Sequence, residues 1–291
     1  MIIDWPKELI ESIARRRSVI FLGSGISANS KNQEGLSPKT WKEFLEHVMN
    51  KNKLQERDKV TQLLSEKKYL LACEMIVDSI GDRLFHEAVQ DEYRRPGYAP
   101  ADIHKAIFML DSRIVVTVNV DKIYDTCVEN ESHSTVVIKN YYDDDLAKYL
   151  RSNDFLLIKA HGSVDKTENM IFTHAQYSKA RCSYASFYQI MDSLILTHTF
   201  IFLGCGIDDP DISLLLENAN FNHKNCPPHY FVTEENSSAD TIQKILLANR
   251  NLKVITYKNV SQKHTELLTA ITELSGAVDN EREILSQRSS W

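Results

Sequence analysis

Two nearly identical seven-residue segments constrain the fold of this chain most: Ile-Phe-Leu-Gly-Ser-Gly-Ile at residues 20–26 and Ile-Phe-Leu-Gly-Cys-Gly-Ile at residues 201–207. Each is an apolar run ending in Gly-x-Gly, a pattern typical of a buried parallel strand followed by a tight turn. Glycine there lets the backbone turn sharply and approach a ligand closely. Because the carboxyl ends of parallel strands share one edge of a sheet, both turns are predicted at the ligand-binding edge, where they could hold two ends of one elongated nucleotide.

The remaining pattern predicts an α/β fold, because strands and helices alternate along most of the chain. Strands are predicted at 18–22, 113–118, 135–138, 155–159, 198–203, 229–232 and 252–257, and helices at 7–17, 122–129, 143–150, 173–196, 210–218, 239–249 and 266–274. Residues from about 38 to 110 have a helical pattern, which predicts a small helical subdomain inserted beside the sheet. We therefore predict a Rossmann-like parallel sheet with helices on both faces, forming one domain over residues 1–275, and a polar C-terminal tail over 276–291.

Charge and cysteine content narrow the class of function. The formal net charge of −6 argues against a general electrostatic grip on nucleic acid, which requires a basic face. The five cysteines include no Cys-x-x-Cys pair, so no structural zinc site is expected, and their odd, scattered arrangement fits a reducing cytoplasm. No signal peptide is visible, and no apolar run approaches the roughly 20 residues that span a bilayer. We expect a cytoplasmic protein with no metal site and no contact with membranes.

The first glycine turn has the features of a phosphate site. Its residues Gly23, Ser24, Gly25, Ile26 and Ser27 continue into Ala28 and match G-x-G-x-x-A, which together with a helix start forms an anion site suited to a diphosphate. The acidic residue that a dehydrogenase carries about twenty positions later is not at a strand end here, because Glu43 and Glu46 fall within a predicted helix. A tight turn that binds no ligand is the alternative interpretation.

Polar side chains follow two further strands at the same predicted edge. Asn119 offers both a donor and an acceptor for ribose hydroxyls or a bound water, whereas Asp121 could instead begin the next helix as its N-cap. His161, followed by Gly162, can act as a general base near neutral pH, although a lone histidine is more often structural. Asn119 and His161 are therefore the candidate catalytic residues.

The second glycine turn contains Gly204, Cys205 and Gly206. We expect Cys205 to fill space rather than to act as a nucleophile, because no basic partner is evident nearby in the sequence. Asp209-Pro210 is typical of a helix start, and the roles of Asp208 and Asp209 are left open.

Taken in order, Gly-Ser-Gly-Ile-Ser, Thr-x-Asn-x-Asp, Lys-x-His-Gly and Gly-x-Gly-x-x-Asp-Pro resemble the motifs of the sirtuin superfamily over about residues 15–260. This resemblance implies a Rossmann-like NAD+ site. It implies that Gly23–Ser27 hold the pyrophosphate, that Asn119 and Asp121 lie beside the nicotinamide ribose, that His161 is the catalytic base, and that Gly204–Gly206 line the adenosine side.

The sequence lacks the four-cysteine zinc module and the Pro-Asp-Phe-Arg segment of deacetylating sirtuins. It is more similar to the sirtuin-like effectors of bacterial anti-phage systems, including the stretch Ser37–Trp41 and the helical insertion. That resemblance implies a hydrolase that depletes NAD+, giving nicotinamide and ADP-ribose without a metal. Because an always-active enzyme of this kind would kill its host, we expect an activating partner subunit or a homo-oligomer. The alternatives are a non-catalytic sensor of NAD+ or ADP-ribose, and a zinc-free deacylase or ADP-ribosyltransferase.

Overall fold

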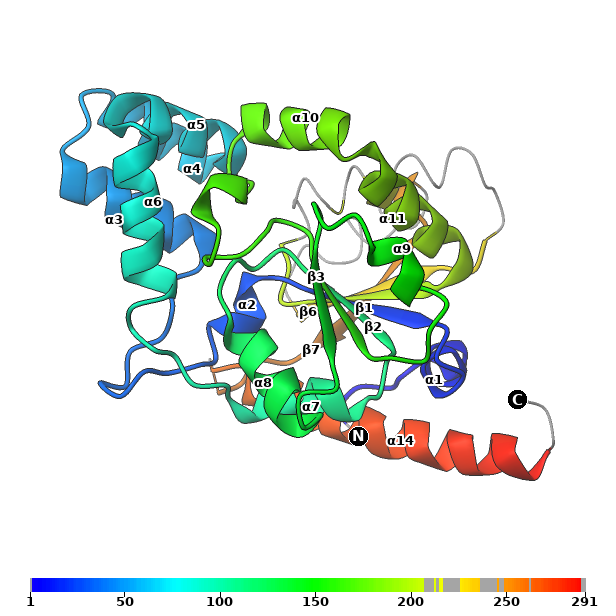
Figure 1. Ribbon diagram of the computed structural model, residues 1–291. Helices are drawn as coiled ribbons and strands as arrows, with labels where there is room; N and C mark the ends of the chain where they lie inside the picture. Colours follow the sequence, from blue (N-terminus) through cyan, green and yellow to red (C-terminus); the bar gives the residue numbers. More distant parts are fainter. Residues whose placement is uncertain are drawn as a thin grey trace.

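The computed structural model describes residues 2–206, 212, 215–216, 226–235, 245, 249–261 and 263–288. Within these residues, seven parallel strands form one sheet in the order β3-β4-β2-β1-β5-β6-β7 (Figure 1). The strands are β1 Ser18–Leu22, β2 Ile114–Thr117, β3 Val137–Asn140, β4 Leu156–Lys159, β5 Thr199–Leu203, β6 His229–Glu234 and β7 Leu252–Tyr257. The predicted Rossmann-like α/β class is confirmed. Of the predicted helices, those over 210–218 and 239–249 fall, apart from a few residues, outside the described part of the chain.

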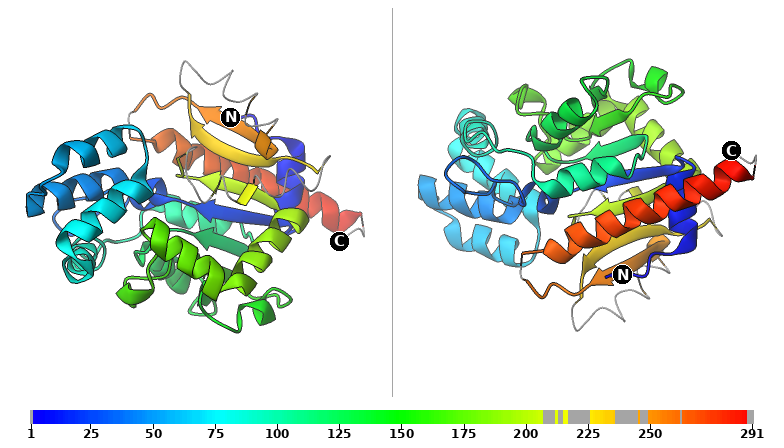
Figure 2. Two further views of the ribbon diagram at one scale, coloured as in Figure 1. Left: turned by 90° about the horizontal axis from the view of Figure 1, so that it is seen from above. Right: turned by 90° about the horizontal axis from the view of Figure 1, so that it is seen from below.

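Helices cover both faces of the sheet because its strands are apolar on both sides. In β1, Ile20 and Leu22 join one buried core while Val19 and Phe21 join the other. The first core is covered by α1 Lys7–Ala14, α7 Asp102–Met109, α8 Ile123–Glu131 and α14 Thr265–Gln287 (Figure 2). The second is covered by α9 Leu146–Tyr149, α10 His174–Ser183 and α11 Ala185–Thr197. Of the described helices, none has both the length and the apolar character needed to cross a membrane.

The chain between β1 and β2 holds the helical insertion. Helices α3 Trp41–Asn52, α4 Arg57–Ser65, α5 Tyr69–Ile80 and α6 Asp82–Tyr93 stand beside the sheet around a third core (Figure 1). Phe172 from the α10 side completes this core, packing edge-on to Phe85 with ring centroids 5.4 Å apart. Helix α7, which lies within the predicted bounds of 38–110, packs on the sheet instead, because Ile103 and Ile107 belong to the first core.

The prediction of a polar tail over residues 276–291 is wrong for residues 276–287, which continue helix α14. Val278 and Leu285 are buried on that helix and lie two helical turns apart, so the helix keeps a narrow apolar stripe on a polar background. Arg282 adds a hydrogen bond from its guanidinium to the Leu110 carbonyl, with 3.0 Å between donor and acceptor. The general polarity of this segment concealed the stripe in the sequence.

One buried histidine predicts how stability depends on pH. The Nδ1 atom of His229, at the start of β6, accepts a hydrogen bond from the Phe200 N–H at 3.1 Å, and burial lowers the pKa of His229 from 6.5 to about 4. The unfolded chain therefore takes up a proton below pH 6.5 that the folded chain does not take up until about pH 4, so stability is lost as the pH falls through this window. We expect this residue to cost about 2 kcal/mol of unfolding free energy between pH 7 and pH 5. The His229→Asn variant keeps a hydrogen-bond acceptor but does not titrate. Urea unfolding at pH 7 and pH 5 should therefore show a loss of unfolding free energy that is about 2 kcal/mol smaller in this variant than in the wild-type protein. An equal decrease in both proteins would contradict the prediction.

Candidate active site

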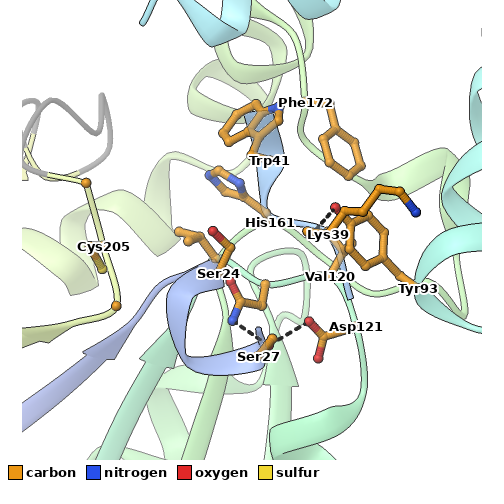
Figure 3. A pocket seen from close by; sticks show the side chains of 14 residues that line it. Ser24, Ser27, Lys39, Trp41, Tyr93, Val120, Asp121, His161, Phe172 and Cys205 are labelled. Carbon is orange, nitrogen blue, oxygen red and sulfur yellow. Dashed lines mark hydrogen bonds between the residues drawn. The ribbon is translucent and has the colours of Figure 1, made fainter. Parts of the chain in front are cut away.

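Four neighbouring strands end at one cavity (Figure 3). Its lining residues follow β4, β2, β1 and β5, the four central strands of the sheet order, and include His161, Asn119, Asp121, Ser24, Ser27, Gly204, Cys205 and Gly206. The cavity holds about 610 Å³ of space, part of it open to solvent, which is in the range of small-molecule sites. The chain leaves β1 toward one edge of the sheet and β5 toward the other, so the cavity lies at the topological switch point where such sheets bind ligands.

The two glycine turns lie in direct contact. The Gly23 N–H donates to the Leu203 carbonyl at 3.0 Å, and the Gly25 N–H donates to the Gly204 carbonyl at 2.9 Å. A Cβ atom added to Gly23 would lie 2.6 Å from the Gly204 oxygen, so the turns need glycine to approach this closely. The turns therefore form a single wall of the cavity. Since both N–H groups bond within the protein, Ser24 and Ser27 are the members of the first turn that face the cavity.

Ile26, the remaining predicted member of that turn, belongs to the buried core beneath it. Short helix α2 Ser24–Ser27 lies within this turn, whereas the sequence pattern predicted a helix that starts after it.

The side chain of Asn119 is fixed by two hydrogen bonds. Its Nδ2 group donates to the Gly23 carbonyl at 3.0 Å and to Ser27 Oγ at 2.9 Å. Because an amide has two N–H donors, both are used within the protein, and the Oδ1 atom is left as an acceptor for a ligand. The sequence predicted that Asn119 could either donate or accept a hydrogen bond from a ligand. In the structure only its acceptor atom, Oδ1, is left for that purpose.

Asp121 supports this arrangement from below. Its Oδ2 atom accepts a hydrogen bond from Ser27 Oγ at 2.8 Å, and its Oδ1 atom accepts one from the Ile123 N–H at 2.9 Å. The second contact is a turn made by the Asp121 side chain just before helix α8, whose N-cap is Lys122 rather than the predicted Asp121. Burial raises the pKa of the Asp121 carboxyl, while the nearby Lys159 ammonium and these hydrogen bonds act in the opposite direction. Both carboxylate oxygens of Asp121 therefore accept hydrogen bonds from within the protein.

His161 enters the cavity from the end of β4. Its side chain is only 4% exposed, and its ring packs edge-on to that of Tyr177 with centroids 6.5 Å apart. Gly162 has a positive φ of 78°, and a Cβ atom there would lie 2.6 Å from the Asn169 oxygen. Glycine is thus required after the histidine so that the chain can turn away and leave the imidazole in the cavity (Figure 3).

Comparison with known proteins agrees with this geometry. A family model described as a SIR2-like domain matches residues 113–255, which include Asn119, Asp121, His161 and the second glycine turn. Residues 113–255 of the chain are thus similar to SIR2-like domains. It is similar to the NAD(+) hydrolase ThsA of Acinetobacter baumannii (strain 532279), with 24% identity over 235 residues that cover 80% of this chain and 45% of the relative. It is also similar to defense-associated sirtuin 2 of Bacillus subtilis, with 24% identity over 263 residues, 87% of this chain and 24% of the relative.

A further relative, the ThsA protein of Enterococcus faecium, is 24% identical over 237 residues, which cover 78% of this chain and 45% of that protein. The chain therefore spans less than half the length of each of these relatives.

The sequence did not predict the cavity residues that come from the helical insertion and from the segment before α10. Trp41 and Tyr93 reach over the cavity from the helical insertion, and Phe172 packs edge-on to Trp41 with ring centroids 6.1 Å apart (Figure 3). Lys39 is held beside them by an ion pair with Glu92, with 2.5 Å between Nζ and Oε2. In the sequence, the stretch Ser37–Trp41 contributed to the family resemblance, but it did not indicate that Lys39 or Trp41 would line the cavity.

The remaining predictions concern the second turn and metals. Cys205 lies against the first turn, since a Cβ atom added to Gly23 would lie 2.8 Å from its Sγ atom. Asp208, Asp209 and Pro210 lie outside the described residues. Across the described part of the chain, no group of three or more His, Cys, Asp or Glu side chains is placed to hold a metal ion.

Proposed function

We propose that this protein hydrolyses NAD+ to nicotinamide and ADP-ribose, as a triggered effector of anti-phage defence. The observation that carries the proposal is the shared cavity, in which the Oδ1 acceptor of Asn119 and the imidazole of His161 come from neighbouring strands. The printed names of the relatives, NAD(+) hydrolase and defense-associated sirtuin, support the substrate and the setting.

The chemistry of the bond explains why these two side chains suffice. Nicotinamide leaves a cationic ring as a neutral molecule and takes the electron pair of the C–N bond, so no general acid is needed. The ribose passes through a transition state like an oxocarbenium ion, as in glycoside hydrolysis. Asn119 Oδ1 would accept a hydrogen bond from a ribose hydroxyl or from the attacking water and so fix its position. His161 would take the proton of that water, or of a ribose hydroxyl, as the new C–O bond forms.

In this proposal the dinucleotide lies along the carboxyl edge of the sheet. The nicotinamide ribose would lie near Asn119 and Asp121, the pyrophosphate near Ser24 and Ser27, and the adenosine beyond Gly204–Gly206. The side chain of Ser24 would contribute to phosphate binding, because the N–H groups of Gly23 and Gly25 are already bonded within the protein and the Ser27 hydroxyl donates its hydrogen to Asp121.

The proposal is tested with purified protein, NAD+ and chromatography of free nicotinamide and ADP-ribose. We expect both products from NAD+ and neither from NADH, whose nicotinamide ring carries no positive charge and leaves poorly. Binding of NAD+ without products would support the sensor instead, and consumption of NAD+ only with an acyl-lysine peptide or acceptor protein would support the deacylase or transferase.

Activation is part of the proposal. We place the protein in the cytoplasm, where NAD+ is available and where five cysteines outside any disulfide fit a reducing compartment. An unregulated enzyme would exhaust the host pool of NAD+, so a partner subunit or assembly of several copies would switch it on. Specific activity that rises with protein concentration would indicate self-assembly, whereas activity that requires a second protein would indicate a partner.

A further inference from the structure

Lys159 is a buried cation that the proposed reaction does not use directly. It is the last residue of β4 and is 1% exposed. Its Nζ atom donates to Asp125 Oδ2 at 2.8 Å and to the backbone carbonyl of Asp121 at 2.6 Å. Asp125 lies in the first turn of helix α8 and is also buried.

Stability alone is a weak reason for this ion pair. Removing two charges from water costs several kcal/mol for each ion, and replacing a buried pair by apolar side chains is often neutral or stabilising. An apolar side chain in place of Lys159 would, however, leave the Asp121 carbonyl without its donor. The contact with that carbonyl is therefore the feature of Lys159 that apolar packing does not reproduce.

The position of Lys159 connects the two candidate catalytic residues. It lies two residues before His161, and the Asp121 carbonyl that it holds lies two residues after Asn119. The Asp121 carboxylate in turn bonds Ser27, which bonds the Asn119 amide. A continuous set of contacts thus runs from the strand that carries His161 to the side chain of Asn119.

We propose that Lys159 is a positioning residue, which sets Asn119 and His161 at their working separation by tying the Asp121 turn to the end of β4. This inference rests on the proposed function for its kinetic consequence, but the restraint on Asn119 can be measured without turnover. Small displacements of groups that orient a reaction can lower its rate by about 100-fold.

The test compares two variants that both remove the buried ion pair. Asp125→Asn keeps the lysine and its hydrogen bond to the Asp121 carbonyl, whereas Lys159→Met combined with Asp125→Leu removes that bond without leaving an unpaired charge. For nicotinamide release we expect Asp125→Asn to stay within about twofold of wild-type kcat, and the double variant to lose about 10- to 100-fold in kcat with KM nearly unchanged. Thermal unfolding of both variants separates this effect from lost stability. Equal kcat in the two variants, or a loss confined to KM, would overturn the inference.

A second measurement needs no catalysis. In NMR spectra we expect the side-chain N–H protons of Asn119 to exchange with solvent faster in the double variant than in Asp125→Asn, because the Asp121–Ser27–Asn119 contacts loosen. Equal exchange rates would overturn the role of Lys159 whether or not the protein cleaves NAD+. Absence of product from the wild-type protein would count against the proposed function only.

Discussion

The His161→Ala variant should release nicotinamide from NAD+ about 10²–10⁴-fold more slowly than the wild-type protein, because loss of a general base usually has an effect of this size. The imidazole lies at a buried position in the cavity, where few waters are available to replace it as a proton acceptor. Initial rates of nicotinamide release at saturating NAD+ measure the effect directly. The affinity for ADP-ribose should change much less, because binding of this product requires no proton transfer to His161.

The matched control is His174→Ala. His174 is exposed at the start of α10 and is not among the residues that line the cavity, so this variant should keep the wild-type rate. Asn119→Ala should resemble His161→Ala in its kcat, since it removes the Oδ1 acceptor. Wild-type turnover in folded His161→Ala and Asn119→Ala proteins would contradict the assignment of both residues.

The sequence was sufficient to predict the sheet because each strand contains or follows a short apolar stretch bounded by polar residues. All seven observed strands begin and end within two residues of the predicted bounds. The candidate site was predictable for a related reason, since residues that follow parallel strands share one edge. Asn119, Asp121 and His161 could thus be placed near the glycine turns before any contact was known.

The contacts between these residues depend on strand order, which local patterns do not contain. Placing β5 directly beside β1 brings Gly204 against Gly23 and makes the two turns one wall. Placing β4 beside β2 brings Lys159 beneath Asp121. The position of Trp41 at the cavity could not be predicted from the sequence for another reason. An inserted subdomain can pack against a sheet in several ways, and local patterns do not distinguish them.

The contact between the glycine turns predicts a large effect on stability. Gly204 has a positive φ of 66°, and a Cβ atom there would lie 2.6 Å from the backbone nitrogen of Ile26. We expect Gly204→Ala to lower the free energy of unfolding by about 2–6 kcal/mol, the sum of left-handed backbone strain and overpacking against main-chain atoms that cannot move aside. Urea unfolding followed by circular dichroism measures this change.

Gly206→Ala is the control for that substitution within the same turn. No described atom lies within 4 Å of a Cβ atom added to Gly206, so the variant should stay within about 0.5 kcal/mol of the wild-type protein. Equal stability of the two variants would mean that the turns are not packed together in solution. If Gly204→Ala remains folded, the shift it forces on Ile26 must also displace the adjoining Ser27, which orients the amide of Asn119. Its nicotinamide release should then fall as well, because the backbone contact that stabilises the sheet edge is the same one that positions the site.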